Sequence, residues 1–312
     1  MKDKLNIKKL VKLAGHLVVI LALAFVVRKI ADMDISLKDL SSPGVIGAFA
    51  LSFVIQTAQI IIACFPWLMF TRSLSGRKIP YSSAMPVYTQ SNIYKYLPGN
   101  VFQYVGRNKL AADMEISHVD VACATVLDVF FCVFWTGAVS VILLGGRIGA
   151  LIEKYGKNLF IAGAAGILIL TALFAFIWLK FRDRLRSYLS RYSKAFERSN
   201  RPQLLSGVFY YFAHNIVSAA MYMSCVALII PQAETRELFT LTGAFLFAWI
   251  IGFVTPGAPG GIGIREGVML FVCGNSYADR ILLFVLVMRI ASVFADVAAF
   301  IIGKIYAKAK SR

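Results

Sequence analysis

The sequence predicts a single polytopic domain, residues 1–312. We expect an all-α integral membrane protein with about seven to eight transmembrane helices, two interrupted or re-entrant elements and a possible internal duplication. Hydrophobic residues make up 59% of the chain, against roughly 45–50% in soluble domains. They gather in runs of about 20 residues, which is the length that crosses a bilayer. Lysine and arginine lie mostly at the ends of these runs.

The first half of the chain is predicted to hold four crossing helices. Lysines before the first of them place the N-terminus in the cytoplasm, where positive residues accumulate. Residues 81–104 are too polar and too interrupted to face lipid, so we expect a re-entrant or interfacial hairpin there. The predicted helices are Leu10–Val27, Val45–Phe70, Val119–Leu144 and Leu159–Leu179.

The segment 180–202 carries the strongest topology signal. From Lys180 to Arg201 it holds eight basic and two acidic residues. Short loops that are rich in lysine and arginine stay in the cytoplasm. We therefore expect this segment to be cytoplasmic and to join two possible repeat halves, 1–179 and 203–312.

The second half of the chain is predicted to contain a broken element between its helices. Seven full helices would leave the basic C-terminal tail outside the cell. An eighth crossing by the broken element puts the tail inside, so eight crossings are preferred. The predicted segments are helices Leu204–Ile230, Leu238–Val254 and Ile281–Ile302, with a half-helix at Ile264–Cys273.

Two stretches interrupt the apolar pattern, one in each half. Residues 253–267 read FVTPGAPGGIGIREG, and residues 95–107 read KYLPGNVFQYVGR. Proline removes a backbone donor and clashes with the preceding turn, and glycine favours non-helical backbone. Irregular backbone at membrane depth survives only when it is buried in protein or lines a wet cavity. In transporters such breaks place half-helix ends at the substrate site.

Four ionisable residues lie inside predicted helices: Asp128, His214, Arg289 and Asp296. Each costs about 2.5–3.5 kcal/mol on insertion scales, so a functional role is the default interpretation. Arg289 and Asp296 share a helical face through their spacing. One interpretation is that they line a polar cavity. The other, which is compatible with it, is that Arg289 and either Asp128 or Asp296 neutralise each other as a packing pair. His214 is either a hydrogen-bonded interior residue or a proton relay.

Arg265 lies in the first turn of the predicted half-helix. The helix dipole disfavours a cation there and favours Glu266. A cation beside the free N–H groups of Gly260, Gly261 and Gly263 predicts an anion-binding site. The alternative is that Arg265 pairs with Glu266 and only fixes the loop.

Arg107 directly follows Gly106 in the first interruption. It either holds a phosphate, like Arg265, or extends to the membrane interface.

The sequence argues against several function classes. The sequence has no catalytic motif, no nucleotide-binding loop and no metal-ligand spacing, so no enzyme activity, cofactor or metal is expected. Nucleic acid is not an expected partner, because the positive charge lies at helix ends rather than in a binding stripe.

The motifs KYLPGN…GR and TPGAPGGIGIREG, together with the helix layout, resemble the lysylphosphatidylglycerol-synthetase transmembrane-region family. This family includes the flippase half of bacterial multiple-peptide-resistance-factor proteins, which also carry a soluble aminoacyl-transferase domain. This sequence shows no such domain, so synthesis of aminoacylated lipid is not expected. The resemblance covers nearly the whole chain and implies lipid translocation or the handling of a lipid-linked substrate. The matching motif positions are Tyr96, Pro98, Gly99, Gly106, Arg107, Pro256, Gly257, Pro259, Gly260, Gly261, Gly263, Arg265 and Glu266.

We therefore expect a flippase or scramblase of the cytoplasmic membrane that moves an anionic phospholipid or a polyprenyl-phosphate-linked lipid. Arg265, Arg107 and Arg289 would hold the phosphate, while Asp128 and Asp296 balance charge or carry protons. One alternative is a scaffold or regulatory subunit of a lipid-modifying enzyme such as a glycosyltransferase, docked through segment 180–202. Another is an intramembrane enzyme that uses Asp128 and His214.

Overall fold

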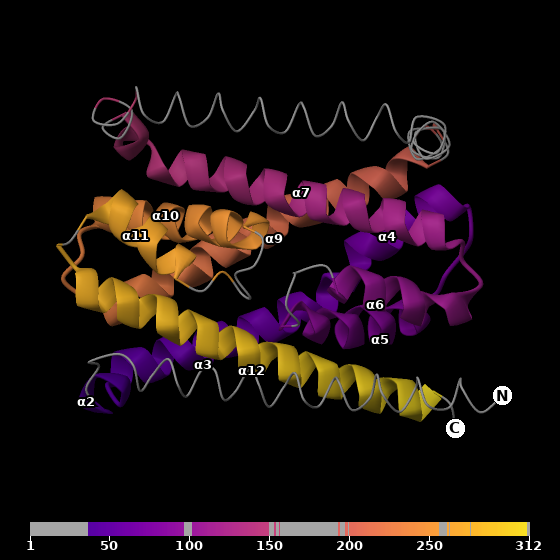
Figure 1. Ribbon diagram of the computed structural model, residues 1–312, viewed down its shortest axis with the longest axis horizontal. Helices are drawn as coiled ribbons and strands as arrows, with labels where there is room; N and C mark the ends of the chain where they lie inside the picture. The colour runs from indigo at the N-terminus through magenta and orange to yellow at the C-terminus, as the bar shows by residue number, and fades with distance from the viewer. Residues whose placement is uncertain are drawn as a thin grey trace.

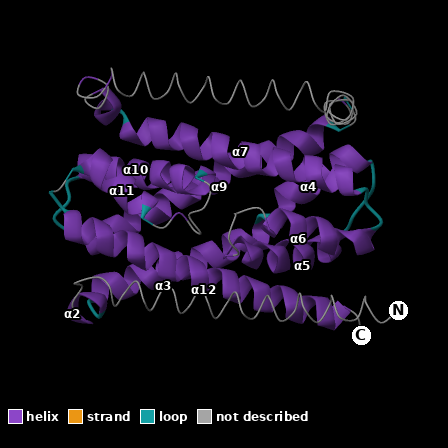
Figure 2. Ribbon diagram, viewed as in Figure 1, coloured by secondary structure: helices purple, strands orange, loops and turns teal. Residues whose placement is uncertain are grey.

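The computed structural model describes residues 37–96, 102–149, 200–255, 263–274 and 276–310, with a few single positions between them. These residues form helices joined by short loops, and no strand occurs among them (Figure 2). Five helical stretches in this part of the chain are long and apolar enough to cross a membrane. The prediction of an all-α, multi-pass membrane protein is thereby confirmed.

Some predicted elements lie outside the described residues. These are the helices Leu10–Val27 and Leu159–Leu179, and segment 180–202 apart from single positions and its last residues. The two repeat halves therefore stay a prediction.

The second predicted helix contains a break. Helix α3 runs from Pro43 to Ile62 and α4 from Cys64 to Ser75, so Val45–Phe70 is not one uninterrupted helix. In a continuous helix the N–H of residue 66 would bond to Ile62, but Pro66 has no N–H. The chain restarts at Cys64, which puts Pro66 in the first turn of α4, where proline is tolerated.

The remaining long helices agree with the prediction to within a few residues at most ends. They are α7 (His118–Leu144), α9 (Arg201–Ile229), α10 (Thr235–Val254) and α12 (Ala278–Lys310), preceded in the chain by the short α2 (Leu37–Leu40). Helix α12 continues through Lys304 and Lys308, well past its predicted end at Ile302. The long helices lie along the longest axis of the molecule, and α3 packs against both α12 and α9 (Figure 1).

A first helical hairpin follows α4. It comprises α5 (Tyr81–Asn92), the 3₁₀ turn η1 (Ile93–Tyr96) and α6 (Phe102–Leu110), with η2 (Ala111–Met114) after it, and α5 packs against α6. At about 1.5 Å per residue, neither α5 nor α6 spans a hydrocarbon core of about 30 Å.

The first hairpin opens at the end of the bundle where α12 finishes. Lys310 donates to the hydroxyls of Ser82 (2.9 Å) and Ser83 (3.0 Å) at the start of α5. Arg77, before the hairpin, pairs with Glu115, after it, at 3.5 Å. We call this end the Lys310 end.

A second hairpin consists of α10 and α11 (Ile264–Cys273), which coincides with the predicted half-helix. It opens at the opposite end, where Tyr277 donates to Glu237 (2.9 Å) and Arg280 pairs with Asp39 (3.7 Å). We call this the Arg280 end. In Figure 1, α5 and α6 lie toward one end of the long axis and α11 toward the other. The two hairpins therefore enter the bundle from opposite ends.

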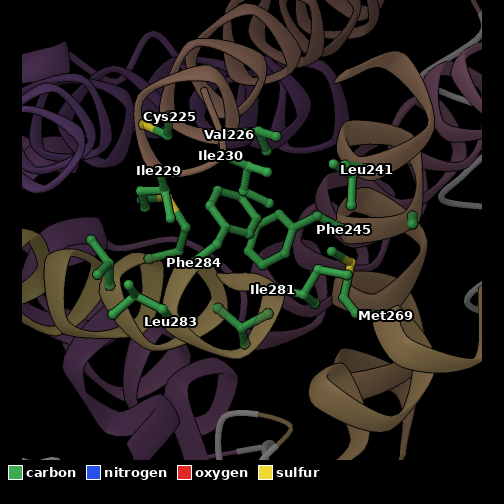
Figure 3. Packing of buried hydrophobic residues seen from close by; sticks show 14 of the residues in the cluster. Cys225, Val226, Ile229, Ile230, Leu241, Phe245, Met269, Ile281, Leu283 and Phe284 are labelled. Carbon is green, nitrogen blue, oxygen red and sulfur yellow. The ribbon is translucent and has the colours of Figure 1, made fainter. Parts of the chain in front are cut away.

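Each hairpin has its own apolar core. The first core surrounds the second hairpin and joins α3, α9, α10, α11 and α12. In it the ring centroids of Phe245 and Phe284 lie 4.9 Å apart, in an edge-to-face contact (Figure 3). The second core contains α5 of the first hairpin and joins it to α4, α7 and α9 around Trp67 and Phe70. Ionisable residues lie beside both cores: Arg289 follows Met288 of the first core on α12, and Asp128 follows Leu127 of the second core on α7.

Candidate functional site

Helix α12 carries the polar face to which both hairpins attach. Asp296 is 1% exposed, and its carboxylate accepts hydrogen bonds from Asn92 (2.7 Å), Lys95 (2.8 Å) and the Tyr96 hydroxyl. All three donors come from the tip of the first hairpin. Asp296 is therefore neutralised by Lys95 and fixes that tip to α12.

Arg289 lies two turns earlier on the same face of α12. It donates to the Gly261 carbonyl (2.8 Å) and to a Glu266 carboxylate oxygen (3.0 Å), both in the second hairpin. A cation at this position compensates the buried Glu266, and it also satisfies a loop carbonyl outside the helix. The polar face of α12 therefore contacts both interrupted elements, and a cavity along it stays a prediction.

The glycines at the second tip have steric reasons to be glycine. Gly261 has φ +69°, and a Cβ on it would lie 2.8 Å from the Cα of Gly252 in α10. Gly263 has φ +77° and precedes the first residue of α11. Side chains at Gly252 or Gly261 would push α11 away from α10.

Arg265 is the exceptional charge of this site. Its side chain packs against Gly252, and its buried Nε has no hydrogen-bond partner among the described residues. Among the other buried or half-buried cations of the same residues, Arg72 donates to the Ile79 carbonyl and Lys304 lies over the Phe300 ring. The remaining three have acidic partners, in the pairs Lys95–Asp296, Arg107–Asp128 and Arg289–Glu266. Arg265 has none. Glu266, Arg289 and Tyr96 lie close enough to Arg265 to interact with it electrostatically, although no ion pair of Arg265 within 4 Å occurs among the described residues.

Arg289 also has a side-chain nitrogen without a hydrogen-bond partner among the described residues. Its Nε is also buried and unpartnered among the described residues, although its NH2 group is engaged. Buried polar groups in proteins are satisfied by protein, water or ligand, so unsatisfied groups need an explanation. An anion bound beside these two neighbouring guanidinium groups would accept hydrogen bonds from their free N–H groups.

Arg107 has a different role from the one predicted for it as a phosphate ligand. It is 2% exposed, pairs with Asp128 at 3.0 Å and stacks on the Tyr88 ring at 3.8 Å. Its Nε donates to Ser91 at 3.3 Å. The arginine is thus already satisfied inside the second core, and it does not extend to the membrane interface. The pair Arg107–Asp128 differs from the predicted packing pairs, which joined Arg289 to Asp128 or Asp296.

His214 does not contact Asp128 through any hydrogen bond among the described residues. The second oxygen of Asp128 accepts from the Tyr211 hydroxyl instead, and His214 Nδ1 lies 3.4 Å from the Tyr210 hydroxyl. The predicted acid–base pairing of Asp128 with His214 is therefore not formed. His214 is held by its helical neighbours.

The remaining predicted motif residues divide in two. Pro98, Gly99, Pro256, Gly257, Pro259 and Gly260 lie outside the described residues. Gly106 is described: a Cβ there would collide with the Tyr94 ring, so α6 packs directly on η1 at this glycine.

Sequence reasoning missed Lys95, Asn92 and Gly252 as site residues. Lys95 stood inside a recognised motif, and a lysine beside a Tyr-Leu-Pro-Gly break is itself a signal of an intramembrane charge. Gly252 has no comparable signal, because its role depends on a close approach of α10 and α11. No cluster of three or more potential metal ligands occurs among the described residues.

Comparison with protein-family models, with curated proteins and with solved structures gave no match for this chain.

Proposed function

We propose that the protein moves an anionic lipid, either a phospholipid or a polyprenyl-phosphate-linked lipid, across the membrane as a flippase or scramblase. The observation that carries the proposal is Arg265, whose Nε is unpartnered and whose guanidinium has no acid within ion-pair distance among the described residues, near the tip of the second hairpin. Burying an unpaired charge costs several kcal/mol, on the order of what an ion pair would return. A phosphate that binds there would offset this cost.

The ligand in this proposal is bound by the second hairpin and α12. Arg265 supplies the uncompensated charge, and Arg289 supplies an N–H beside it. Glu266 and Gly261 hold Arg289 in position. The net positive charge of the site favours a lipid with a negative head group over a zwitterionic one.

The opposed hairpins provide a path for the head group. Helices α5 and α6 are too short to cross the bilayer, so the first hairpin covers part of its depth from the Lys310 end. In the second hairpin α10 is long enough to cross, whereas α11 covers only part of the depth from the Arg280 end. Half-helices that meet near the bilayer midplane are the arrangement from which alternating-access transporters are built. In this proposal the acyl chains stay in lipid while the phosphate passes between the tips.

The arrangement also supports an orientation. The Lys310 end carries the basic residues Arg77, Lys78, Lys109, Lys308 and Lys310, whereas the Arg280 end carries Arg147, Arg236 and Arg280 beside Asp39 and Glu237. By the positive-inside rule the Lys310 end faces the cytoplasm. Because the second hairpin returns to the end where it began, the basic C-terminal tail lies on the same side as Arg201, which starts α9.

Charge-dependent transport is the direct test. The purified protein is reconstituted in liposomes with fluorescent phosphatidylglycerol, and lipid movement between leaflets is followed by dithionite quenching. We expect Arg265→Ala to reduce the rate to that of protein-free liposomes and Arg265→Lys to retain part of it. Arg280→Ala removes an arginine from the exposed Arg280 end and serves as the matched control. Equal rates in wild-type and Arg265→Ala proteins would exclude the assigned site.

A further inference from the structure

A groove between α6 and α7 is separate from the Arg265 site. It has a volume of about 910 Å³, within the range of about 300–1,000 Å³ found for ligand pockets. Its α7 wall repeats at helical spacing through Ala122, Val126 and Phe130, and Tyr104 and Val105 of α6 form the facing wall. Val105, Val126 and Phe130 are each more than half exposed, so the groove opens outward.

The two ends of the groove differ in polarity. Its Lys310 end is lined by Lys109, Asn108 and His118, while apolar side chains form the rest of the lining except Thr125. Asn108 donates to the His118 carbonyl at 2.7 Å, and its side-chain oxygen contacts His118 Nδ1, which fixes both residues. Of the two acids that follow Lys109 in the chain, Glu115 is paired with Arg77, and Asp113 forms no ion pair with Lys109 within 4 Å among the described residues.

The length of the groove matches one leaflet. From His118 to Phe130 a helix rises about 18 Å, and half of a hydrocarbon core is about 15 Å. A cationic and hydrogen-bonding end near the membrane surface, continued by an apolar channel of leaflet depth, has the polarity of a phospholipid.

We propose that this groove binds one anionic phospholipid of the leaflet at the Lys310 end. The phosphate lies against Lys109 and the Asn108–His118 pair, and an acyl chain lies along Ala122, Val126 and Phe130. The site goes beyond the transport proposal, because it needs neither Arg265 nor movement between leaflets.

Photolabelling in liposomes tests the site. Phosphatidylglycerol and phosphatidylcholine, each with a diazirine in an acyl chain, are compared at equal mole fraction, and labelled peptides are mapped by mass spectrometry. We expect labelling concentrated in residues 102–130 and about a fivefold preference for phosphatidylglycerol, which corresponds to one surface lysine. Lys109→Gln should bring that preference close to one while labelling persists.

Tryptophan substitutions that fill the groove provide a second test. Ala122→Trp should reduce labelling of residues 102–130 severalfold, and Val126→Trp repeats the test if the first variant fails to yield folded protein. Ile142→Trp is the matched control, because Ile142 is 76% exposed on the same helix and outside the groove. Labelling in Arg265→Ala protein should equal wild type, which separates this site from the transport site.

Three results would overturn the proposal. These are labelling spread evenly over lipid-facing helices, labelling unchanged by both tryptophan variants, and equal labelling by the two lipids in the wild type. A change of oligomeric state in Ala122→Trp, measured by chemical cross-linking, would instead identify the groove as an interface between copies of the chain.

Discussion

Lys95 and Asp296 are 201 residues apart in the sequence, yet Lys95 Nζ and Asp296 Oδ2 lie 2.7 Å from each other. This pair attaches the tip of the first hairpin to α12, the helix that also holds the second hairpin through Arg289. One helix therefore fixes both interrupted elements, and Arg265 is left facing them without an acidic partner among the described residues.

Asp296→Ala should destabilise the protein strongly. Three donors of the first hairpin lose their common acceptor, and breaking a buried pair costs about 3–5 kcal/mol, an upper bound here because Lys95 is partly exposed. The measurement is the thermal unfolding midpoint in detergent. Asp279→Ala, an exposed acid in the first turn of the same helix, is the control and should lower the midpoint only slightly, because such an acid contributes about 0.3–1 kcal/mol. Equal midpoints for the two variants would contradict the assigned role of Asp296.

The Arg107–Asp128 pair should behave as a coupled structural unit. Both side chains are almost fully buried, so Arg107→Met leaves an isolated carboxylate and should cost about 3–5 kcal/mol. Arg107→Met combined with Asp128→Asn removes both charges and should recover part of the loss. A double-mutant cycle of unfolding free energies measures this coupling. Strictly additive effects would show that the pair does not hold the second core together.

Two glycines of the second hairpin should respond in opposite directions to alanine. Gly261→Ala meets the α10 backbone at a positive φ and should disrupt the tip of the hairpin. Gly267→Ala has open space within helix α11, and replacing a helical glycine should stabilise by about 0.5–1 kcal/mol. Thermal unfolding and transport rate check both variants. A harmless Gly261→Ala would mean that α10 and α11 do not approach as closely as described.

Arg265→Met should separate stability from activity. Replacing an unpaired buried cation by an apolar side chain of similar length should leave the unfolding midpoint equal or higher, because the cost of charge burial disappears. Transport should nevertheless be lost. A large drop in the midpoint would indicate instead that Arg265 has a structural partner.

The sequence predicts the helices well because their signals are local. Apolar runs between charged ends fix α7, α9 and α10, and the Pro- and Gly-rich stretch before Ile264 fixes the start of α11. The α3–α4 break was not predicted, although Pro66 carried the signal, because one proline in a long apolar run is often tolerated in membrane helices.

Which charge pairs with which could not be predicted. Arg107 and Arg265 have the same residue type, and both lie beside glycines, but only Arg107 meets an aspartate when the chain folds. Likewise Asp296 could have neutralised Arg289 on its own helix, yet each pairs with a different hairpin. These choices depend on how the hairpins dock, and no periodicity in the sequence records that.

Head-group selectivity of transport tests the central claim most directly. Rates for fluorescent phosphatidylglycerol and phosphatidylcholine are measured in the same liposomes for wild-type and Arg265→Met proteins. If Arg265 binds the lipid anion, the wild type should move phosphatidylglycerol faster, and the variant should lose this preference. A preference for phosphatidylglycerol that is the same in both proteins would contradict the account.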